Sequence, residues 1–341
     1  MSIQRAYCSM SFLEDIIKQR KQSPHKIAYE LLNKLCDIYV DVPKQDIIER
    51  INSNDVLKAL WRRENRAIRS FTDAEKQLKE AKADDLFFFS EFDKKFDKKR
   101  VKEEKMARGI FMATQSDMYL FERVCHGQYR PFNLAPKKLR HGEDVEFESI
   151  DSWEAVFDDI DISPINAAVI TDNFMFKEKF PERKRQSLYA ILKCIVPSTL
   201  EIPFHLTIFF NTNNGKLSKD DADAIVDEIH NLNLCKEIKV SIVSHLVKNT
   251  THDREILTNY HYIHSGAGFS VIDANGVQEV AKGEIKSVYH CISSIPAQTT
   301  VKHLHTQMLE WLKQIYYEKR GSNKLKTFKT GDDFENRLLS D

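Results

Sequence analysis

Short apolar runs alternate with amphipathic helical patterns from residue 5 to residue 130. The runs lie at residues 6–11, 36–42, 86–89 and 109–114. Apolar runs of this length, bounded by polar segments, are typical of strands covered on both faces of a sheet. The intervening segments carry helix starts: Ser23 precedes Pro24, and Thr72 lies three residues before Glu75. This rhythm predicts an α/β Rossmannoid layer of four parallel strands joined by crossover helices.

The helix expected between the last two of these strands, at residues 93–108, is heavily charged. Its sequence begins D-K-K-F-D-K-K-R and then mixes lysine with glutamate at positions 102–105. A stretch of one sign would suggest a nucleic-acid surface, but mixed signs along a helix are typical of a solvated face with ion pairs along it. We therefore expect a solvent-exposed helix here.

A second α/β rhythm follows a break at residues 133–148, where proline, glycine and charged residues interrupt the periodicity. Strands are predicted at 166–176, 202–211 and 237–246, and helices at 182–196, 218–234 and 299–319. Residues 320–341 are polar and contain glycine, as in a tail or a loosely packed cap. The predicted organisation is an N-terminal domain at 1–132, a C-terminal domain at 149–319 and a polar tail at 320–341.

Length and composition agree with two α/β domains. The chain has 341 residues, whereas single hydrophobic cores stop growing at about 250 to 300 residues. Fifty-one basic residues balance fifty-one acidic ones, so contacts with nucleic acid or an anionic membrane would need a local patch. Six scattered cysteines without a C-x-x-C pair predict free thiols in a reducing compartment. Because the chain has neither a signal-peptide core nor a membrane-spanning apolar run of about 20 residues, we expect a cytoplasmic protein.

The segment that scaffolding explains least runs from residue 251 to residue 273. It reads T-H-D-R-E-I-L-T-N-Y-H-Y-I-H-S-G-A-G-F-S-V-I-D and spaces His252, Arg254 and Asn259 as H-x-R-x-x-x-x-N. A histidine beside a cation could attack a phosphodiester whose oxygens the cation binds. Alternatively, these polar side chains could form a buried network that fixes a strand turn.

This spacing resembles the H-x-K-x-x-x-x-D motif of phospholipase D-type enzymes. The resemblance implies that His252 is the nucleophile and that Arg254 is the phosphate-binding cation. Arginine in place of lysine keeps the charge, whereas Asn259 in place of aspartate removes the carboxylate that would support an imidazolium. One chain carries one such motif, so an active centre would need two chains.

A second set of residues extends the resemblance. The run H-D-R-E-I at 252–256, the turn G-A-G-F at 266–269 and the T-T-V stretch at 299–301 are similar to the phospholipase D-like domain found C-terminal to MIT domains in endosomal-sorting proteins. The similarity covers about residues 150–318. It implies a retained fold without established hydrolysis, a homodimer, and an anion site for acidic phospholipid headgroups that would include Arg254 and Asn259.

A local basic patch lies at Arg183, Lys184 and Arg185. If this patch lies beside Arg254, a polyanion such as nucleic acid or a phosphoinositide could span both. A solvated helix face is the alternative.

The spacing of elements in the N-terminal half, with a late strand leading to Asp117, resembles the PIN-like nuclease fold. That resemblance implies a divalent metal such as Mg²⁺ held by carboxylates near strand ends, for which the candidates are Glu14, Asp41, Glu91 and Asp117. Serine occurs at positions 9 and 11, where the family carries its first aspartate. This departure favours surface acids on a Rossmannoid scaffold over a metal site.

These observations lead to two hypotheses. We expect a non-catalytic interaction or sensing protein, without a cofactor, that binds nucleic acid or acidic phospholipid through its C-terminal domain and forms a homodimer. The alternative is a nuclease, either a homodimeric phospholipase D-type enzyme using His252 or a metal-dependent PIN-type enzyme.

Overall fold

The fold is mixed α/β and is seen in a computed structural model. The structure describes residues 4–63, 67–119, 130–133, 148–149, 153–157, 164–172, 175–176, 182–211, 217–245, 254–265, 269, 285–290 and 328–340. Among these residues, no helix combines the length and the apolar character needed to cross a membrane.

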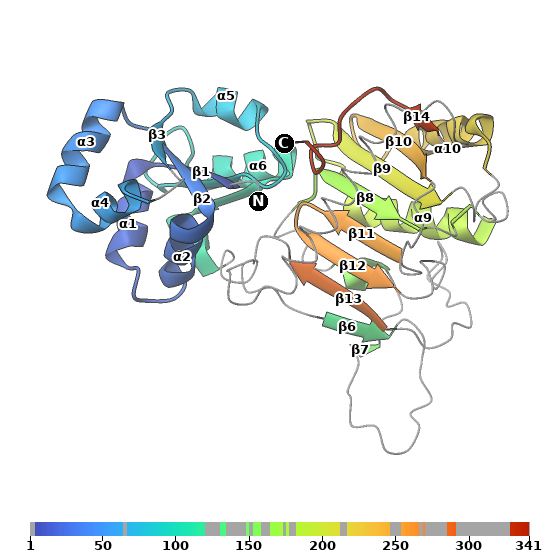
Figure 1. The fold of residues 1–341 in the computed structure, drawn as a ribbon, viewed down its shortest axis with the longest axis horizontal. Coiled ribbons are helices and arrows are strands. Elements are labelled where there is room, and N and C mark those ends of the chain that lie inside the picture. The colour runs from blue at the N-terminus through green and yellow to red at the C-terminus, as the bar shows by residue number, and fades with distance from the viewer. Residues whose placement is uncertain are drawn as a thin grey trace, which may run out of the picture.

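The N-terminal domain is built on a parallel sheet. Its elements are β1 (Gln4–Cys8), α1 (Met10–Lys18), α2 (His25–Leu35), β2 (Cys36–Val40), α3 (Lys44–Ser53), α4 (Asp55–Trp61), β3 (Ile68–Ser70), α5 (Ala74–Lys79), β4 (Leu86–Phe89), α6 (Lys98–Arg108), β5 (Phe111–Thr114) and the 3₁₀ turn η1 (Gln115–Asp117). In this described region the five strands lie in the order β3-β2-β1-β4-β5, and every neighbouring pair is parallel (Figure 1). The four predicted strands are present, joined by β3, in which only Ile68 is buried and which therefore left a weak apolar signal.

The charged helix is shorter than predicted. Residues 91–96 form turns, and α6 begins at Lys98 with the Asp97 side chain accepting the Arg100 N–H at 2.9 Å. The physical reason is Phe96, which is buried and stacks on Phe89 with ring centroids 4.1 Å apart. That contact draws the chain into the core before the helix can start.

The C-terminal domain has a larger sheet. Its elements are β6 (Arg130–Asn133), β7 (Glu148–Ser149), α8 (Trp153–Val156), β8 (Ala167–Thr171), α9 (Glu182–Ile195), β9 (Phe204–Asn211), α10 (Lys219–Asn231), β10 (Ile238–His245), β11 (Arg254–Thr258), β12 (His261–Ser265), β13 (Ile285–His290) and β14 (Lys329–Gly331). Within the described part of the chain, nine strands lie in the order β14-β10-β9-β8-β11-β12-β13-β6-β7. The central β10-β9-β8 pairs are parallel, whereas β11, β12 and β13 continue the sheet antiparallel. The predicted helices at 182–196 and 218–234 are confirmed as α9 and α10, and the predicted strands as β8, β9 and β10.

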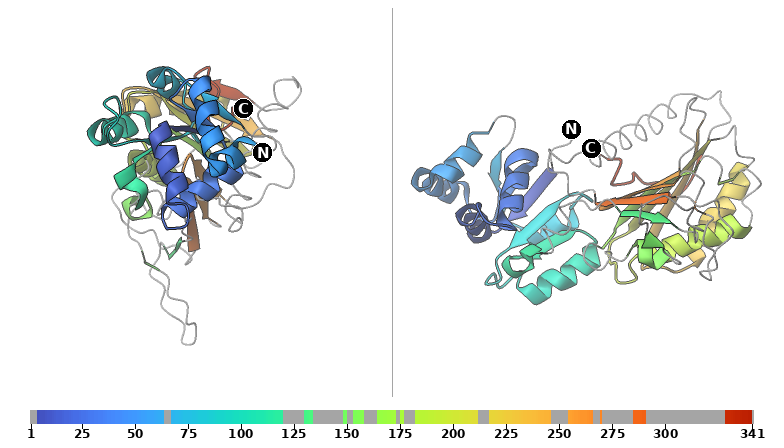
Figure 2. Two further views of the ribbon diagram at one scale, coloured as in Figure 1. Left: turned by 90° about the vertical axis from the view of Figure 1, so that its left-hand side faces the viewer. Right: turned by 90° about the horizontal axis from the view of Figure 1, so that it is seen from below.

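The sheet alternates its side chains between two separate cores. Ile170 and Ile256 belong to the large core that includes Leu192 of α9, and α9 and α10 lie on that side of the sheet in the right-hand view of Figure 2. Val169 and Leu257 belong to a smaller core on the other face. Because successive residues of a strand point to opposite faces of the sheet, neighbouring residues join different cores.

The expected boundary at 133–148 falls inside the C-terminal sheet. Strand β6 pairs with β13, and β7 pairs with β6 in parallel. The two ends of the predicted linker are therefore sheet neighbours. Residues 130–132, which the prediction gave to the N-terminal domain, belong to the second sheet.

The C-terminal segment also departs from the expected polar tail. Strand β14 pairs antiparallel with β10, and the buried Asn336 donates its Nδ2 to the carbonyl of Ala168 at 3.0 Å. Leu338 and Leu339 pack into the smaller core together with Ala83 of the N-terminal domain. Residues 328–340 are therefore part of the packed fold rather than a tail. The predicted helix at 299–319 lies outside the described residues.

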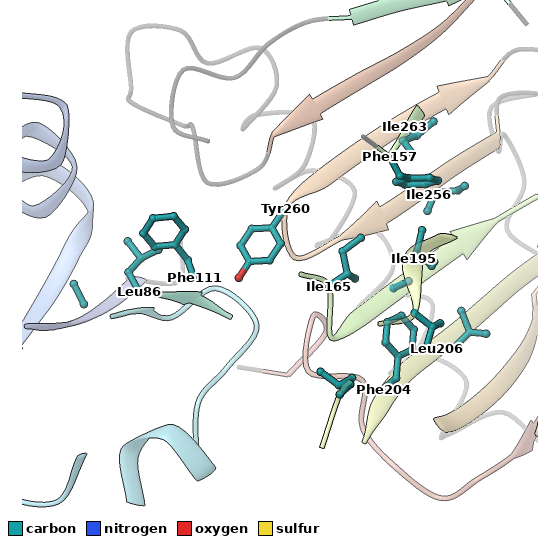
Figure 3. Packing of buried hydrophobic residues seen from close by; sticks show 14 of the residues in the cluster. Leu86, Phe111, Phe157, Ile165, Ile195, Phe204, Leu206, Ile256, Tyr260 and Ile263 are labelled. Atoms are coloured by element: carbon teal, nitrogen blue, oxygen red, sulfur yellow. The ribbon is translucent and has the colours of Figure 1, made fainter. Parts of the chain in front are cut away.

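The two domains share a continuous apolar core. Leu86 and Phe111, at the amino ends of β4 and β5, belong to the same cluster as Ile165 and Tyr260 of the C-terminal domain. Figure 3 shows the Tyr260 ring between these two groups. The amino edge of the N-terminal sheet therefore packs against the C-terminal domain, and its carboxyl edge lies at the other end of the strands.

Candidate functional site

Arg254 is the first residue of β11 and lies at the end of the C-terminal sheet where the parallel strands finish. The parallel strands β8, β9 and β10 all end at this edge, and β11 runs antiparallel to β8 with Glu255 opposite Thr171. Asp172 follows directly after β8, and its Oδ1 lies 3.4 Å from Arg254 Nε. In open α/β sheets, ligands bind at the carboxyl ends of the parallel strands, so this is the edge at which a site is expected.

The Arg254–Asp172 ion pair is largely removed from water. The side chains of Arg254 and Asp172 are 14% and 5% exposed. By strand alternation, Arg254 lies on the same face as Ile256, the face that carries α9 and α10. A buried ion pair is retained at a desolvation cost, and guanidinium is the cation best suited to such a position. The sequence singled out the arginine but missed its partner, although Asp172 directly follows an apolar run.

The rest of the predicted motif is not assembled around Arg254. His252 lies outside the described residues. Asn259 follows the last residue of β11, five residues beyond Arg254. At about 3.3 Å per residue the two positions are about 16 Å apart along the strand. The strand therefore separates Asn259 from Arg254, and the two cannot bind one phosphate together.

The side chain of Asn259 instead joins the two domains. It is 3% exposed, its Nδ2 donates to the carbonyl of Gly109 at 2.8 Å, and its Oδ1 accepts the Asn166 N–H at 3.2 Å. The Tyr260 hydroxyl also donates to Gly109, at 3.4 Å, and burial raises the pKa of that hydroxyl well above its ordinary value. Both side chains thus act as neutral donors in a buried position.

The acceptors at this junction are carbonyls at the end of α6. The Glu201 N–H donates to Ala107 at 2.9 Å, and Asn166 Nδ2 donates to Arg108 at 2.9 Å. The last carbonyls of a helix have no partner within the helix and carry its negative partial charge. The C-terminal domain therefore caps α6 of the N-terminal domain. A carboxylate at position 259 would place negative charge against these carbonyls, which gives a physical reason for asparagine there. The sequence offers no signal for this contact.

Gly109 is suited to the junction in both conformation and size. It ends α6 in the left-handed conformation with φ of 62°. A Cβ atom at this position would come within 2.7 Å of Asn166 Cβ and 2.9 Å of the Ile165 carbonyl oxygen. Glycine alone meets both requirements without a shift of the C-terminal domain.

The predicted basic patch lies in the first turn of α9. Arg183 and Lys184 are helical, and nothing is described of their side chains. Arg185 Nε lies 3.3 Å from Oε2 of Glu228 on α10, and the Tyr189 hydroxyl donates to the same carboxylate. Arg185 therefore links two helices of its own domain.

Three of the four candidate acidic residues of the N-terminal domain follow strand ends, whereas Glu14 lies within a helix. Asp41, Glu91 and Asp117 follow β2, β4 and β5 at the carboxyl edge of the sheet, and Glu14 lies in α1. Each is engaged locally: Asp41 accepts the Met10 N–H at 2.7 Å, Glu91 the Ser116 N–H at 2.8 Å and Asp117 the Thr114 hydroxyl at 2.8 Å, while Glu14 lies 2.5 Å from Arg50. Burial raises the pKa of Asp41.

Among the described residues, no group of three or more histidine, cysteine, aspartate or glutamate side chains is placed to hold a metal ion. At the end of β1, Ser9 stands where the PIN-like resemblance would place an aspartate. Its hydroxyl accepts the Ser90 N–H at 2.9 Å. The arrangement uses the carboxylate oxygens of Asp41, Glu91 and Asp117 in hydrogen bonds that close the strand ends.

A scan against protein-family models and a search of curated proteins both found no match to this chain.

Proposed function

We propose that this chain is a non-catalytic interaction or sensing protein that binds a phosphodiester-containing partner through its C-terminal domain. The observation that carries the proposal is the largely buried Arg254, which β11 places at the edge where the parallel strands end and which is paired with Asp172. Guanidinium binds phosphate with directed, charge-assisted hydrogen bonds. The similarity of segment 252–269 to the phospholipase D-like domain found after MIT domains supports the same chemistry.

Asp172 has a defined part in this proposal. Its carboxylate contacts Nε, the guanidinium nitrogen nearest the side-chain stem. This ion pair keeps the guanidinium beside the end of β8 before a ligand arrives. Asn259 contributes to the architecture that holds β11 in place, because its amide is used between the domains.

The proposal is tested by binding across a salt series. Fluorescent single-stranded DNA, RNA and vesicles containing acidic phospholipid are titrated with the full chain, with Arg254→Gln and with the control Arg69→Gln. Arg69 is 59% exposed and lies 3.9 Å from Asp37 in the N-terminal domain. We expect salt-sensitive binding to one of these ligands, about tenfold weaker in Arg254→Gln and unchanged in the control. Circular dichroism verifies that each variant is folded. Absence of salt-sensitive binding to all three ligands refutes the proposal.

A nuclease is the second candidate. The observation that favours it is the placement of Asp41, Glu91 and Asp117 along one edge of a parallel sheet. A phospholipase D-type reaction would persist in a chelator and be lost in His252→Ala, whereas a PIN-type reaction would be lost in the chelator. Light scattering tests the homodimer that the phospholipase D-type centre requires.

A further inference from the structure

The carboxyl edge of the N-terminal sheet displays two exposed aromatic rings. Phe92 follows β4 and is 89% exposed, and Tyr119 follows η1 and is 63% exposed. Single exposed apolar side chains are ordinary on protein surfaces. Here, two such rings lie at one edge of the same sheet, on the side of the domain opposite the C-terminal domain.

The loop that carries Phe92 is folded into consecutive turns. The Asp93 N–H donates to the Ser90 carbonyl at 3.0 Å, and the Phe96 N–H donates to the Asp93 carbonyl at 3.0 Å. The Asp93 carboxylate accepts the Lys95 N–H at 2.9 Å. Phe96 is 1% exposed and anchors the end of the loop. One phenylalanine of this loop is thus buried as an anchor, while the backbone bonds hold the other in solvent.

A hydrogen bond joins this loop to the one that carries Tyr119. Glu91, next to Phe92, accepts the Ser116 N–H at 2.8 Å, and Ser116 lies three residues before Tyr119. Met118, immediately before Tyr119, is 2% exposed and anchors that segment in the core. Strands β4 and β5 are neighbours, so both rings project from adjacent loops of one edge.

The basic and acidic side chains around Phe92 differ in their contacts. Lys94, Lys95 and Lys98 are exposed, and within the described residues none of them forms an ion pair. Two acidic side chains of the same segment accept backbone N–H groups: Asp93 that of Lys95, and Asp97 that of Arg100 at the start of α6. The ammonium groups therefore extend into solvent while the carboxylates satisfy the loop. The predicted solvated helix face with ion pairs is confirmed for α6, as in Lys99–Glu103 and Arg100–Glu104. Residues 91–96, which carry Phe92, Lys94 and Lys95, lie outside that helix.

We propose that Phe92, Tyr119, Lys94, Lys95 and Lys98 form a binding surface for single-stranded nucleic acid. Bases stack on the two rings, and the lysines contact the phosphates. Stacking on aromatic side chains and a basic surface that follows the backbone are the two components of single-strand recognition without sequence preference. The loop is held in place before binding, so little ordering cost opposes the contact. A duplex keeps its bases stacked on each other, so it offers no free base to these rings.

This surface belongs to a different domain from Arg254 and does not rest on the function proposed for that residue. The test uses the full chain and fluorescence anisotropy with a 20-nucleotide single-stranded DNA, the matching RNA and the corresponding duplex. Variants are Phe92→Ala, Tyr119→Ala, Phe92→Tyr and the charge reversal Lys95→Glu. Ile48→Ala is the control, since Ile48 is also exposed but lies in α3. All of these positions are exposed, so the variants are expected to fold.

We expect single strands to bind more tightly than duplex, and binding to weaken about tenfold in Phe92→Ala and in Tyr119→Ala. Phe92→Tyr, which keeps a ring, should bind within about twofold of the parent, and Lys95→Glu should weaken binding and its salt dependence. Equal single-strand binding by the parent, Phe92→Ala and Tyr119→Ala overturns the proposal. Loss of vesicle binding rather than nucleic-acid binding in these variants also overturns it, because it assigns the rings to lipid. If Arg254→Gln alone abolishes single-strand binding, this inference fails while the function proposed for Arg254 stands.

Discussion

Replacing Asn259 by aspartate should destabilise the fold by an amount that depends on pH. The change removes the Nδ2 donor that reaches the Gly109 carbonyl at 2.8 Å and sets a carboxyl group into a position that is 3% exposed. The Gly109 carbonyl then keeps only the longer hydrogen bond from the Tyr260 hydroxyl, at 3.4 Å, and loss of the shorter buried bond costs about 1 kcal/mol. An unpaired buried charge beside the negative end of α6 raises the total to about 3 to 5 kcal/mol.

The sign of the pH dependence follows from the site. Burial and the carbonyls of α6 favour the neutral acid, so the pKa of the introduced carboxyl group in the folded variant lies above the unfolded aspartate value of about 3.9. The folded variant then holds its proton more tightly than the unfolded chain. The loss of stability is smallest below about pH 4 and grows as the pH rises toward the folded pKa. The protonated acid can also donate to the Gly109 carbonyl, as the amide does.

The measurement is urea denaturation of Asn259→Asp and the parent protein at pH 5 and pH 8, compared as differences at each pH. A deficit of about 3 kcal/mol at pH 8 corresponds to a urea midpoint about 1 M lower. The control is Asn233→Asp, because Asn233 is exposed and its Nδ2 donates to the Asn231 carbonyl at 3.0 Å. This variant also places a carboxylate near the C-terminal end of a helix, α10, but at an exposed position, so its loss should stay below about 1 kcal/mol. An Asn259→Asp deficit below about 0.5 kcal/mol, or one that is equal at both pH values, refutes the interdomain role of the amide.

Three further results are expected from the same structure. Leu339→Ala should lower the free energy of unfolding by about 2 to 4 kcal/mol, measured by urea denaturation, because Leu339 is 2% exposed in the smaller core; a change near zero would mean that the C-terminal segment is not packed. Burial and the nearby Arg337 guanidinium lower the pKa of His205 to about 3 in the folded protein. As the pH falls below about 6.5, the unfolded chain therefore takes up a proton at His205 that the folded protein does not. The contribution of His205 to the free energy of unfolding should be about 2 kcal/mol lower at pH 5 than at pH 8. His205→Gln should remove that contribution, and an unchanged pH profile would contradict it. Asp172→Asn should cost about 3 kcal/mol by removing the carboxylate that lies beside the largely buried Arg254, and the double variant with Arg254→Gln should recover part of the loss; additive losses in the double-mutant cycle would show that the two side chains are not coupled.

Much of the secondary structure could be predicted because its signals are local. The apolar runs at 36–42 and 86–89 became β2 and β4, and the capping residue Ser218 begins α10 through a reciprocal bond with Asp221. Hydrophobic periodicity and capping depend on residues three or four positions apart, so one sequence window contains the whole signal. The α/β class follows from the order of these elements.

The domain limits and the C-terminal segment could not be predicted in the same way. Strand β14 is three residues long and has only Thr330 buried, so its pattern is that of a polar tail. It is a strand because the edge of β10 offers it hydrogen-bond partners. Pairing partners that are distant in sequence leave no periodicity within either segment, and the same is true of β6 and β7.

For the candidate site, the sequence determined which residue types are present and the tertiary structure decided what each one does. Spacing alone grouped Arg254 with Asn259, but an extended strand places them at opposite ends. Asp172 reaches Arg254 from a neighbouring strand, and the acceptor of Asn259 lies 150 residues earlier in the chain, at the end of a helix in the other domain. A hydrogen bond depends on distance in space, and chain spacing sets that distance only within one regular element.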